Sequence, residues 1–160
     1  MAVTAAELLP RLLVGVSEYD MVSLDEHLEV HGPPPDLRAW RPEQLVDEIE
    51  AAGLRGHGGA AFPVGTKMRA VATRRGLAIV VANGSEGEPA SRKDRVLLRE
   101  LPHLVLDGAA AAARAVGARE AIITLEGEDD RSVRSLELAL NERHRARLAG
   151  DPRFELFFVA

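Results

Sequence analysis

The chain has 160 residues, no cysteine and a formal net charge of -5 at pH 7. This length predicts one domain with a substantial core, and the lack of cysteine excludes disulfides and any thiolate-held zinc or iron–sulfur cluster supplied by this chain. The acidic balance, with only one Trp, one Tyr and four Phe, argues against nucleic acid as a partner.

The N-terminal region is not expected to target or anchor the protein. Residues 1–16 have no basic lead and contain Glu7, so a signal peptide is not expected. No run reaches the roughly 18 apolar residues of a membrane span, so we expect a cytoplasmic protein without membrane insertion. The segment HGPPPD (31–36) cannot be helical, because each proline fixes its own φ and disfavours helix in the residue before it. It separates an N-terminal extension, 1–36, from a domain at 37–160.

Helical and strand patterns follow one another from Pro42 onward. A helix begins at Pro42 and continues to Gly53, which suits a left-handed C-terminal cap. The later expected elements are a strand at 77–83 buried on both faces, a helix at about 102–117, a strand at 121–125, a helix from about Asp129 to before Gly150, and a strand at 154–160. This order predicts an α/β fold in which a parallel, Rossmann-like sheet with right-handed crossovers is flanked by helices.

The stretch GLRGHGGAAFPVG (53–65) has five glycines in thirteen positions. Residues 56–61 match G-x-G-x-x-A, but a dinucleotide fingerprint needs a preceding strand, and here a helix precedes it. A Walker loop also fails, because Thr66 separates Gly65 from Lys67. The remaining interpretation is a nest of backbone N–H groups for an anion or a flat ring, with Lys67 as a charge for phosphate. A flexible surface loop is the alternative.

A polar turn, NGSEGEP, follows the strand predicted at 77–83. Ligands of open parallel sheets bind beyond the carboxyl ends of strands, and the acidic side chains there can accept hydrogen bonds from ribose hydroxyls or ring N–H groups. The polar residues concerned are Asn83, Ser85, Glu86 and Glu88. A solvated acidic turn and a magnesium site formed with Asp94 are the alternatives. The five histidines are scattered and predict neither a triad nor a metal site.

Three stretches together, GLRGHGGAAFPVGTK, VVANGSEGEPASRKDR and LPHLVLDG, resemble the NADH-binding, FMN-carrying subunit of respiratory complex I, the F-type subunit of NADH-quinone oxidoreductase, and related subunits of NAD-linked hydrogenases and formate dehydrogenases. The resemblance covers about residues 40–128 and extends more loosely to 160. The flavin contacts that it implies come from Gly56, Gly58, Gly59, Lys67, Asn83, Ser85 and Glu86. The implied NADH contacts come from Phe62 and Glu88.

The chain departs from the family pattern at several positions. His57 replaces arginine, Ala61 replaces glycine, Met68 replaces tryptophan, Ser85 replaces a flavin-contacting aspartate, and Ala70 replaces a second aromatic residue. The family's later flavin segment and its cysteine-rich domain with a [4Fe-4S] cluster are missing. The chain therefore resembles the N-terminal half of such a flavin domain, as an expressed fragment or a truncated relative.

The resemblance implies hydride transfer from NADH to FMN, followed by electron transfer to an iron–sulfur protein or to the missing C-terminal half. The cofactor does this chemistry, so the chain needs no general acid or base for the hydride step. The alternative is a truncated, non-catalytic relative that binds a nucleotide weakly or serves as an interaction module. In that case the last strand, 154–160, would present an unpaired edge that invites association.

Overall fold

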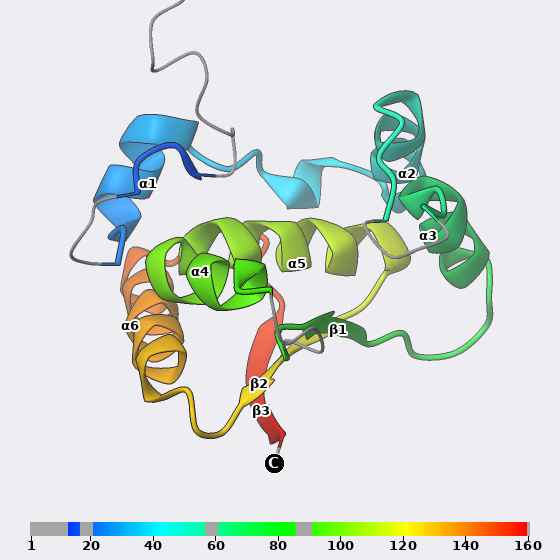
Figure 1. The fold of residues 1–160 in the computed structure, drawn as a ribbon. Helices are drawn as coiled ribbons and strands as arrows, with labels where there is room; N and C mark the ends of the chain where they lie inside the picture. Colours follow the sequence, from blue (N-terminus) through cyan, green and yellow to red (C-terminus); the bar gives the residue numbers. More distant parts are fainter. Residues whose placement is uncertain (1–12, 17–20, 57–60, 86–90, 160) are drawn as a thin grey trace, which may run out of the picture.

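The computed structural model describes residues 13–16, 21–56, 61–85 and 91–159 (Figure 1). Its elements are α1 (Leu24–His31), η3 (Leu37–Ala39), α2 (Pro42–Ala51), α3 (Val64–Ala72), β1 (Val80–Asn83), α4 (Lys93–Glu100), α5 (Pro102–Val116), β2 (Glu120–Glu126), α6 (Asp130–Ala146) and β3 (Arg153–Val159). The strands pair in parallel in the order β1-β2-β3. The predicted α/β fold, a parallel sheet with flanking helices, is confirmed.

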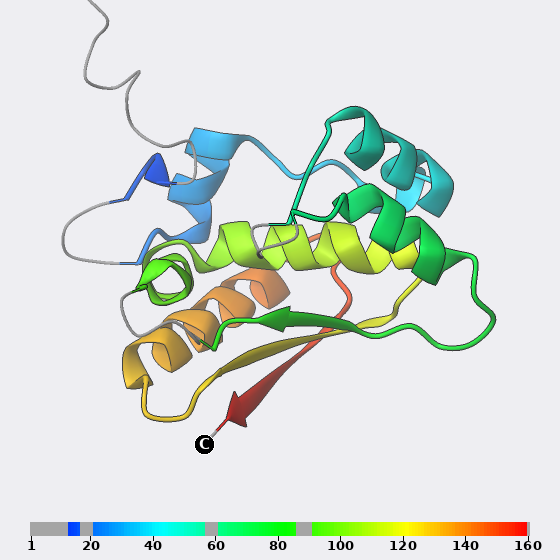
Figure 2. The same cartoon turned by 45° about the vertical axis from the view of Figure 1, so that its right-hand side comes forward.

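The core lies between β2 and the helices α4, α5 and α6, which gather on one side of the sheet (Figure 2). Alternate residues of β2 are buried, as expected when one face of a strand meets helices. On the other face Val81 and Phe157 are each 59% exposed. The prediction that the first strand is buried on both faces is therefore wrong, because no helix of the described chain covers that second face.

The first strand is also shorter than predicted. It begins at Val80, and Leu77 is 97% exposed. Val80 pairs with Ala121, and β2 begins only one residue before that. Residues 77 and 78 therefore have no neighbouring strand with which to form a parallel ladder.

Local signals placed the other predicted elements correctly. Gly117 ends α5 with a φ of 71°, the left-handed geometry that glycine favours. The side chain of Asp129 accepts a hydrogen bond from the Ser132 amide and caps α6. Gly53, after α2, has a φ of 64°. Each of these signals acts within a few residues of the helix end, so the end of the helix can be located from the sequence alone.

Three α-helices were not predicted: α1, α3 and α4. A capping box of Ser23 and Glu26 begins α1, and Pro63 precedes α3. Both signals stand in the sequence, but helices of eight and nine residues are too short to give a clear periodic pattern. Within the described residues, no helix is both long and apolar enough to cross a membrane.

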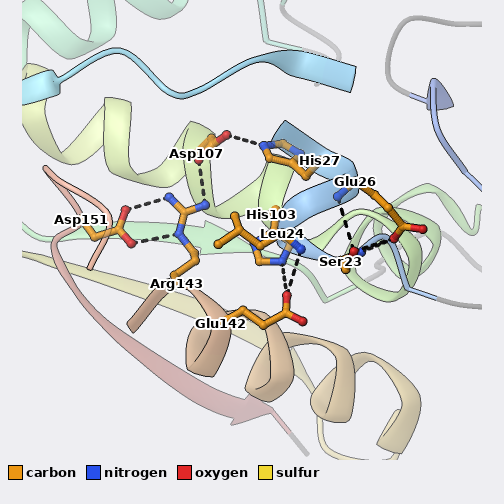
Figure 3. Close-up of polar contacts among 9 residues, drawn as sticks. All are labelled: Ser23, Leu24, Glu26, His27, His103, Asp107, Glu142, Arg143 and Asp151. Carbon is orange, nitrogen blue, oxygen red and sulfur yellow. Dashed lines mark hydrogen bonds and ion pairs between the residues drawn. The ribbon is translucent and has the colours of Figure 1, made fainter. Parts of the chain in front are cut away.

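Buried polar side chains hold α1 against α5 and α6 (Figure 3). Nε2 of His27 lies 2.8 Å from Oδ2 of Asp107, and Nε2 of His103 lies 2.9 Å from Oε2 of Glu142. The Leu24 amide donates to the same Glu142 oxygen at 3.0 Å. Both histidines are 1% exposed. The position of α1 therefore depends on hydrogen bonds to residues far along the chain.

The environment of this polar cluster shifts several pKa values. Burial lowers the pKa of His103 below its ordinary value, although the hydrogen bond to Glu142 opposes that effect. Burial raises the pKa of Asp107, but the hydrogen bond from His27 and the charge of Arg143 outweigh burial and leave that pKa below its ordinary value. Both groups therefore resist protonation in the folded protein.

We expect the folded protein to lose stability as the pH falls below about 6.5. A group whose pKa is lower in the folded state stabilises fully above its unfolded pKa, and that contribution declines as the pH falls below it. The decline begins near 6.5, the ordinary value for His103, and Asp107 adds a second loss below about 3.8. Urea unfolding at pH 7.5, 6.5 and 5.5 measures the effect. The variant His103→Gln should flatten the slope between pH 6.5 and 5.5, whereas His144→Gln, at an exposed site on α6, should keep it.

Candidate functional site

The glycine-rich stretch forms a closed loop between α2 and α3. The Gly56 amide donates to the Phe62 carbonyl, and the Val64 amide donates to the Leu54 carbonyl, each at 2.9 Å. Arg55 and Pro63 form an antiparallel bridge between these two bonds. The two described stems of the loop are therefore paired like a short hairpin. Its tip, 57–60, lies outside the described residues, and so do the predicted contacts of Gly58 and Gly59.

Ala61 occupies a backbone conformation that glycine favours. Its φ is 43°, in the left-handed region where a Cβ atom costs about 1–2 kcal/mol. A glycine would adopt this conformation without that cost.

Lys67 lies in the first turns of α3, just beyond the loop. Among the described residues its ammonium group has no hydrogen-bond or ion-pair partner, and the side chain is exposed. Phe62, at the end of the loop, is 54% exposed. The exposed ring of Phe62 therefore lies just before Pro63, and the ammonium group of Lys67, which has no partner in the described chain, lies after it. The ring can stack on another aromatic ring, and the ammonium group can bind a phosphate.

The direction of α3 is set by its packing on α2. Gly65 lies so close to Glu50 that an added Cβ would come within 3.0 Å of the Glu50 amide nitrogen. Arg69 of α3 reaches back to Asp47 and Glu50 with hydrogen bonds of 2.8 and 2.6 Å. The hydrogen bond from Arg69 lowers the pKa of Glu50. The helix that carries Lys67 is thus held by a close glycine contact and by ion pairs.

The second candidate segment follows β1, at the carboxyl edge of the sheet. Oδ1 of Asn83 accepts hydrogen bonds from Oγ1 of Thr124 at 3.0 Å and from the Ser85 amide at 3.1 Å. The Gly84 amide donates to the Thr124 carbonyl at 2.9 Å. Three bonds thus fix the first residues of the turn. Glu86 and Glu88 lie outside the described residues.

Two polar groups of this turn have no partner within the described residues. Oγ of Ser85 is buried and makes no hydrogen bond there. The Asn83 side chain is exposed, and its two bonds both go to the oxygen, which leaves Nδ2 unused. A buried hydroxyl without a partner costs free energy unless a ligand or water satisfies it. Nδ2 of Asn83 and Oγ of Ser85 are therefore hydrogen-bonding groups that the described chain leaves unused.

The residues of the magnesium alternative are only partly described. Asp94 forms an ion pair with Lys93 at 2.8 Å, and Glu86 and Glu88 fall outside the described chain. Across the described ranges, no group of three or more metal-binding side chains is arranged to hold an ion.

Cavity volume does not identify the site. Beside the turn, a hollow of about 120 Å³ is lined by Asn83, Asp94 and apolar side chains of neighbouring elements. Ligand pockets usually measure about 300–1,000 Å³. A larger hollow, about 680 Å³, lies at the opposite edge of the sheet beside Arg143 and Arg153.

The two candidate segments lie on elements that pack around α5. Helices α2 and α3 pack against the C-terminal end of α5, and β1 runs beneath α5 (Figure 2). The described parts of the loop and of the turn share no hydrogen bond or ion pair. Their convergence on one ligand stays a prediction, because the tips of both segments fall outside the described residues.

One polar residue of this site was missed by the sequence analysis. Thr124 lies beside Asn83 across the β1–β2 pair. Its only signal was a hydroxyl in the otherwise apolar run AIITL. The partner stands 41 residues away, so the pairing depends on strand register, which the run alone does not specify.

Comparison with known proteins places this arrangement in a family. The model of the Nuo51 FMN-binding domain matches residues 49–159. The second F-type subunit of NADH-quinone oxidoreductase from Rhizobium meliloti (strain 1021) is 36% identical over 109 residues, which are 68% of this chain and 26% of that protein. The F-type subunit from Rhodobacter capsulatus is 38% identical over 108 residues, or 66% of this chain and 25% of that protein.

Solved structures agree with the sequence matches. The crystal structure of an NAD⁺-reducing [NiFe]-hydrogenase in the H2-reduced state superposes with a TM-score of 0.70 at 34% identity, over 80% of this chain and 23% of the hydrogenase chain. This chain thus spans about a quarter of the length of each of these relatives. The family match covers the loop, the turn and all three strands, and the chain belongs to the Nuo51 FMN-binding domain family.

Proposed function

We propose that this chain is a flavin-binding oxidoreductase module that holds FMN and receives hydride from NADH. The observation that carries the proposal is the set of unused donors, Lys67, Nδ2 of Asn83 and Oγ of Ser85, within a chain segment of the FMN-binding domain family. FMN, when bound, supplies hydride acceptance and the release of single electrons. The domain would comprise residues 37–160, with 1–36 as an extension, and we expect the protein to be cytoplasmic.

Each residue has a separate part in this proposal. Lys67 and the backbone amides of the glycine loop, including those of Gly58 and Gly59, bind the phosphate. Asn83 and Ser85 orient the ring, together with Glu86. Phe62 and Glu88 contact NADH. Electrons then pass to an iron–sulfur protein or to a polypeptide that corresponds to the remaining part of the longer relatives.

A second candidate function is a non-catalytic interaction module. It is favoured by the exposed edge strand β3, where Phe157, Phe158 and Val159 are 59%, 51% and 40% exposed. An unpaired edge with apolar side chains invites association with another chain. In this case FMN binding is weak or absent, and NADH does not reduce the added flavin.

Titration of the purified 160-residue chain with FMN, followed by flavin fluorescence, tests the proposal. We expect saturable quenching, and bleaching of the bound flavin on addition of NADH. The variant Lys67→Gln should weaken FMN binding about tenfold or more, because it removes a charge-assisted contact to phosphate.

The matched control is Arg74→Gln, which removes a positive charge at an exposed position just beyond α3. It should bind FMN within about twofold of the unchanged protein. If the unchanged chain shows no quenching at high micromolar FMN, autonomous flavin binding is refuted and the interaction module is favoured.

A further inference from the structure

Asn83 and Thr124 are neighbours across the parallel β1–β2 pair. They are register partners at the carboxyl ends of their strands, so their side chains stand on the same face of the sheet. Oγ1 of Thr124 lies 3.0 Å from Oδ1 of Asn83. The threonine is the donor in this pair, because the asparagine atom also accepts a backbone N–H.

That second bond decides which way the asparagine amide faces. The Ser85 amide, which can only donate, lies 3.1 Å from the same Asn83 oxygen. A carbonyl oxygen has two lone pairs, and both are now occupied. Nδ2 therefore points away from Thr124, and on this exposed side chain it has no acceptor among the described residues. Asn83 consequently offers a ligand two N–H groups and no acceptor.

Thr124 holds the turn at a second point that does not involve its side chain. Its carbonyl accepts the Gly84 amide at 2.9 Å. This backbone hydrogen bond does not depend on the Thr124 side chain. A substitution of that side chain can therefore change how the Asn83 amide is held without changing the path of the backbone. Removal of the hydroxyl leaves the turn in place, but the Asn83 oxygen is then held only by the Ser85 amide, so the side chain is positioned by one hydrogen bond instead of two.

We propose that Thr124 is a positioning residue that, together with the Ser85 amide, holds the Asn83 amide with its N–H groups toward the ligand, and that this end of the site therefore selects a planar ring with an acceptor edge, such as the carbonyl edge of a flavin. The inference rests on the proposed function, since it assigns the ligand group that Asn83 meets. Thr124 itself acts only through Asn83.

The test compares Thr124→Val, which keeps the shape of the side chain but removes its donor, with Thr124→Ser, which keeps the donor. For the valine variant we expect FMN affinity to fall about fivefold and the visible absorption band of bound flavin to move toward that of free FMN. The serine variant should restore both. A loss of packing alone would not be rescued by serine, which is the smaller residue.

A second readout does not need FMN. In ¹⁵N-labelled protein without ligand, the side-chain amide resonances of Asn83 should shift in Thr124→Val and return toward their original positions in Thr124→Ser. Unchanged resonances in the valine variant overturn the inference whether or not FMN binds. Shifted resonances in a chain that fails to bind FMN refute the proposed function and its flavin ligand, but uphold the positioning of Asn83. Unchanged FMN affinity in the valine variant overturns the assigned role in ligand binding.

Discussion

Replacing Arg143 by methionine is expected to lower the free energy of unfolding by about 3–5 kcal/mol. Arg143 is 3% exposed. It donates two hydrogen bonds to Asp151, at 2.9 and 2.7 Å, and its Nη1 lies 2.8 Å from Asp107 (Figure 3). Methionine fills a similar volume but leaves two half-buried carboxylates without their cation. Asp107 also forms a hydrogen bond with His27, so the loss of Arg143 is expected to weaken the contact between α5 and α1 as well.

Urea unfolding at pH 7 measures this loss, with Arg145→Met as the matched control. Arg145 is exposed on the same helix, and its replacement should change the unfolding free energy by less than about 0.5 kcal/mol. The triple variant Arg143→Met, Asp107→Asn, Asp151→Asn should recover part of the loss, because it removes the unpaired charges. A loss below about 1 kcal/mol in the single variant would show that the ion cluster does not hold this region together.

Replacing Gly84 by alanine is expected to displace the turn after β1 and to weaken FMN binding more than tenfold. A Cβ atom at this position would lie 2.7 Å from the Thr124 carbonyl oxygen and 2.5 Å from Cδ1 of Leu98. The leucine side chain can rotate away, but the carbonyl belongs to the central strand and cannot. The turn must therefore move, and Asn83 and Ser85 move with it. We also expect a loss of about 1–3 kcal/mol in stability, as for other overpacked sites.

The control for this variant is the same substitution at Gly108. That glycine lies within α5, and an added Cβ would meet no atom within 4 Å. Alanine there should be neutral or stabilising by up to about 1 kcal/mol, because glycine weakens a helix interior. Calorimetry and FMN titration of both variants separate a local clash from a general effect of adding a methyl group. If Gly84→Ala binds FMN with unchanged affinity, the turn after β1 is not part of the binding site.

Part of the candidate site was predictable from the sequence. Lys67 and Asn83 belong to short motifs, so the sequence alone predicts them as candidate residues, and their contact with FMN stays a prediction. Thr124 was not, because its role arises from a pairing between strands that are far apart along the chain. The structure also adds a restriction that the motif did not contain: the oxygen of Asn83 is occupied, so the residue presents N–H groups.

For the N-terminal helix α1, too, the sequence indicates where the helix begins but not how it packs. The capping box of Ser23 and Glu26 stands in the sequence and accounts for where α1 begins. Its packing depends on Asp107 and Glu142, which are 80 and 118 residues from their partners His27 and Leu24. A helix with few apolar residues gives no sign of such polar partners in its own sequence.

By itself, the sequence determined the strands β2 and β3, the helices α2, α5 and α6, and the class of fold, because caps and periodicity act within a few residues of each element. Only the tertiary structure decided that the described helices leave one face of the sheet uncovered, that β1 is limited to Val80–Asn83, and that Thr124 meets Asn83. These features depend on which distant segments come together. Burial and pairing are properties of both partners, and a local pattern describes only one of them.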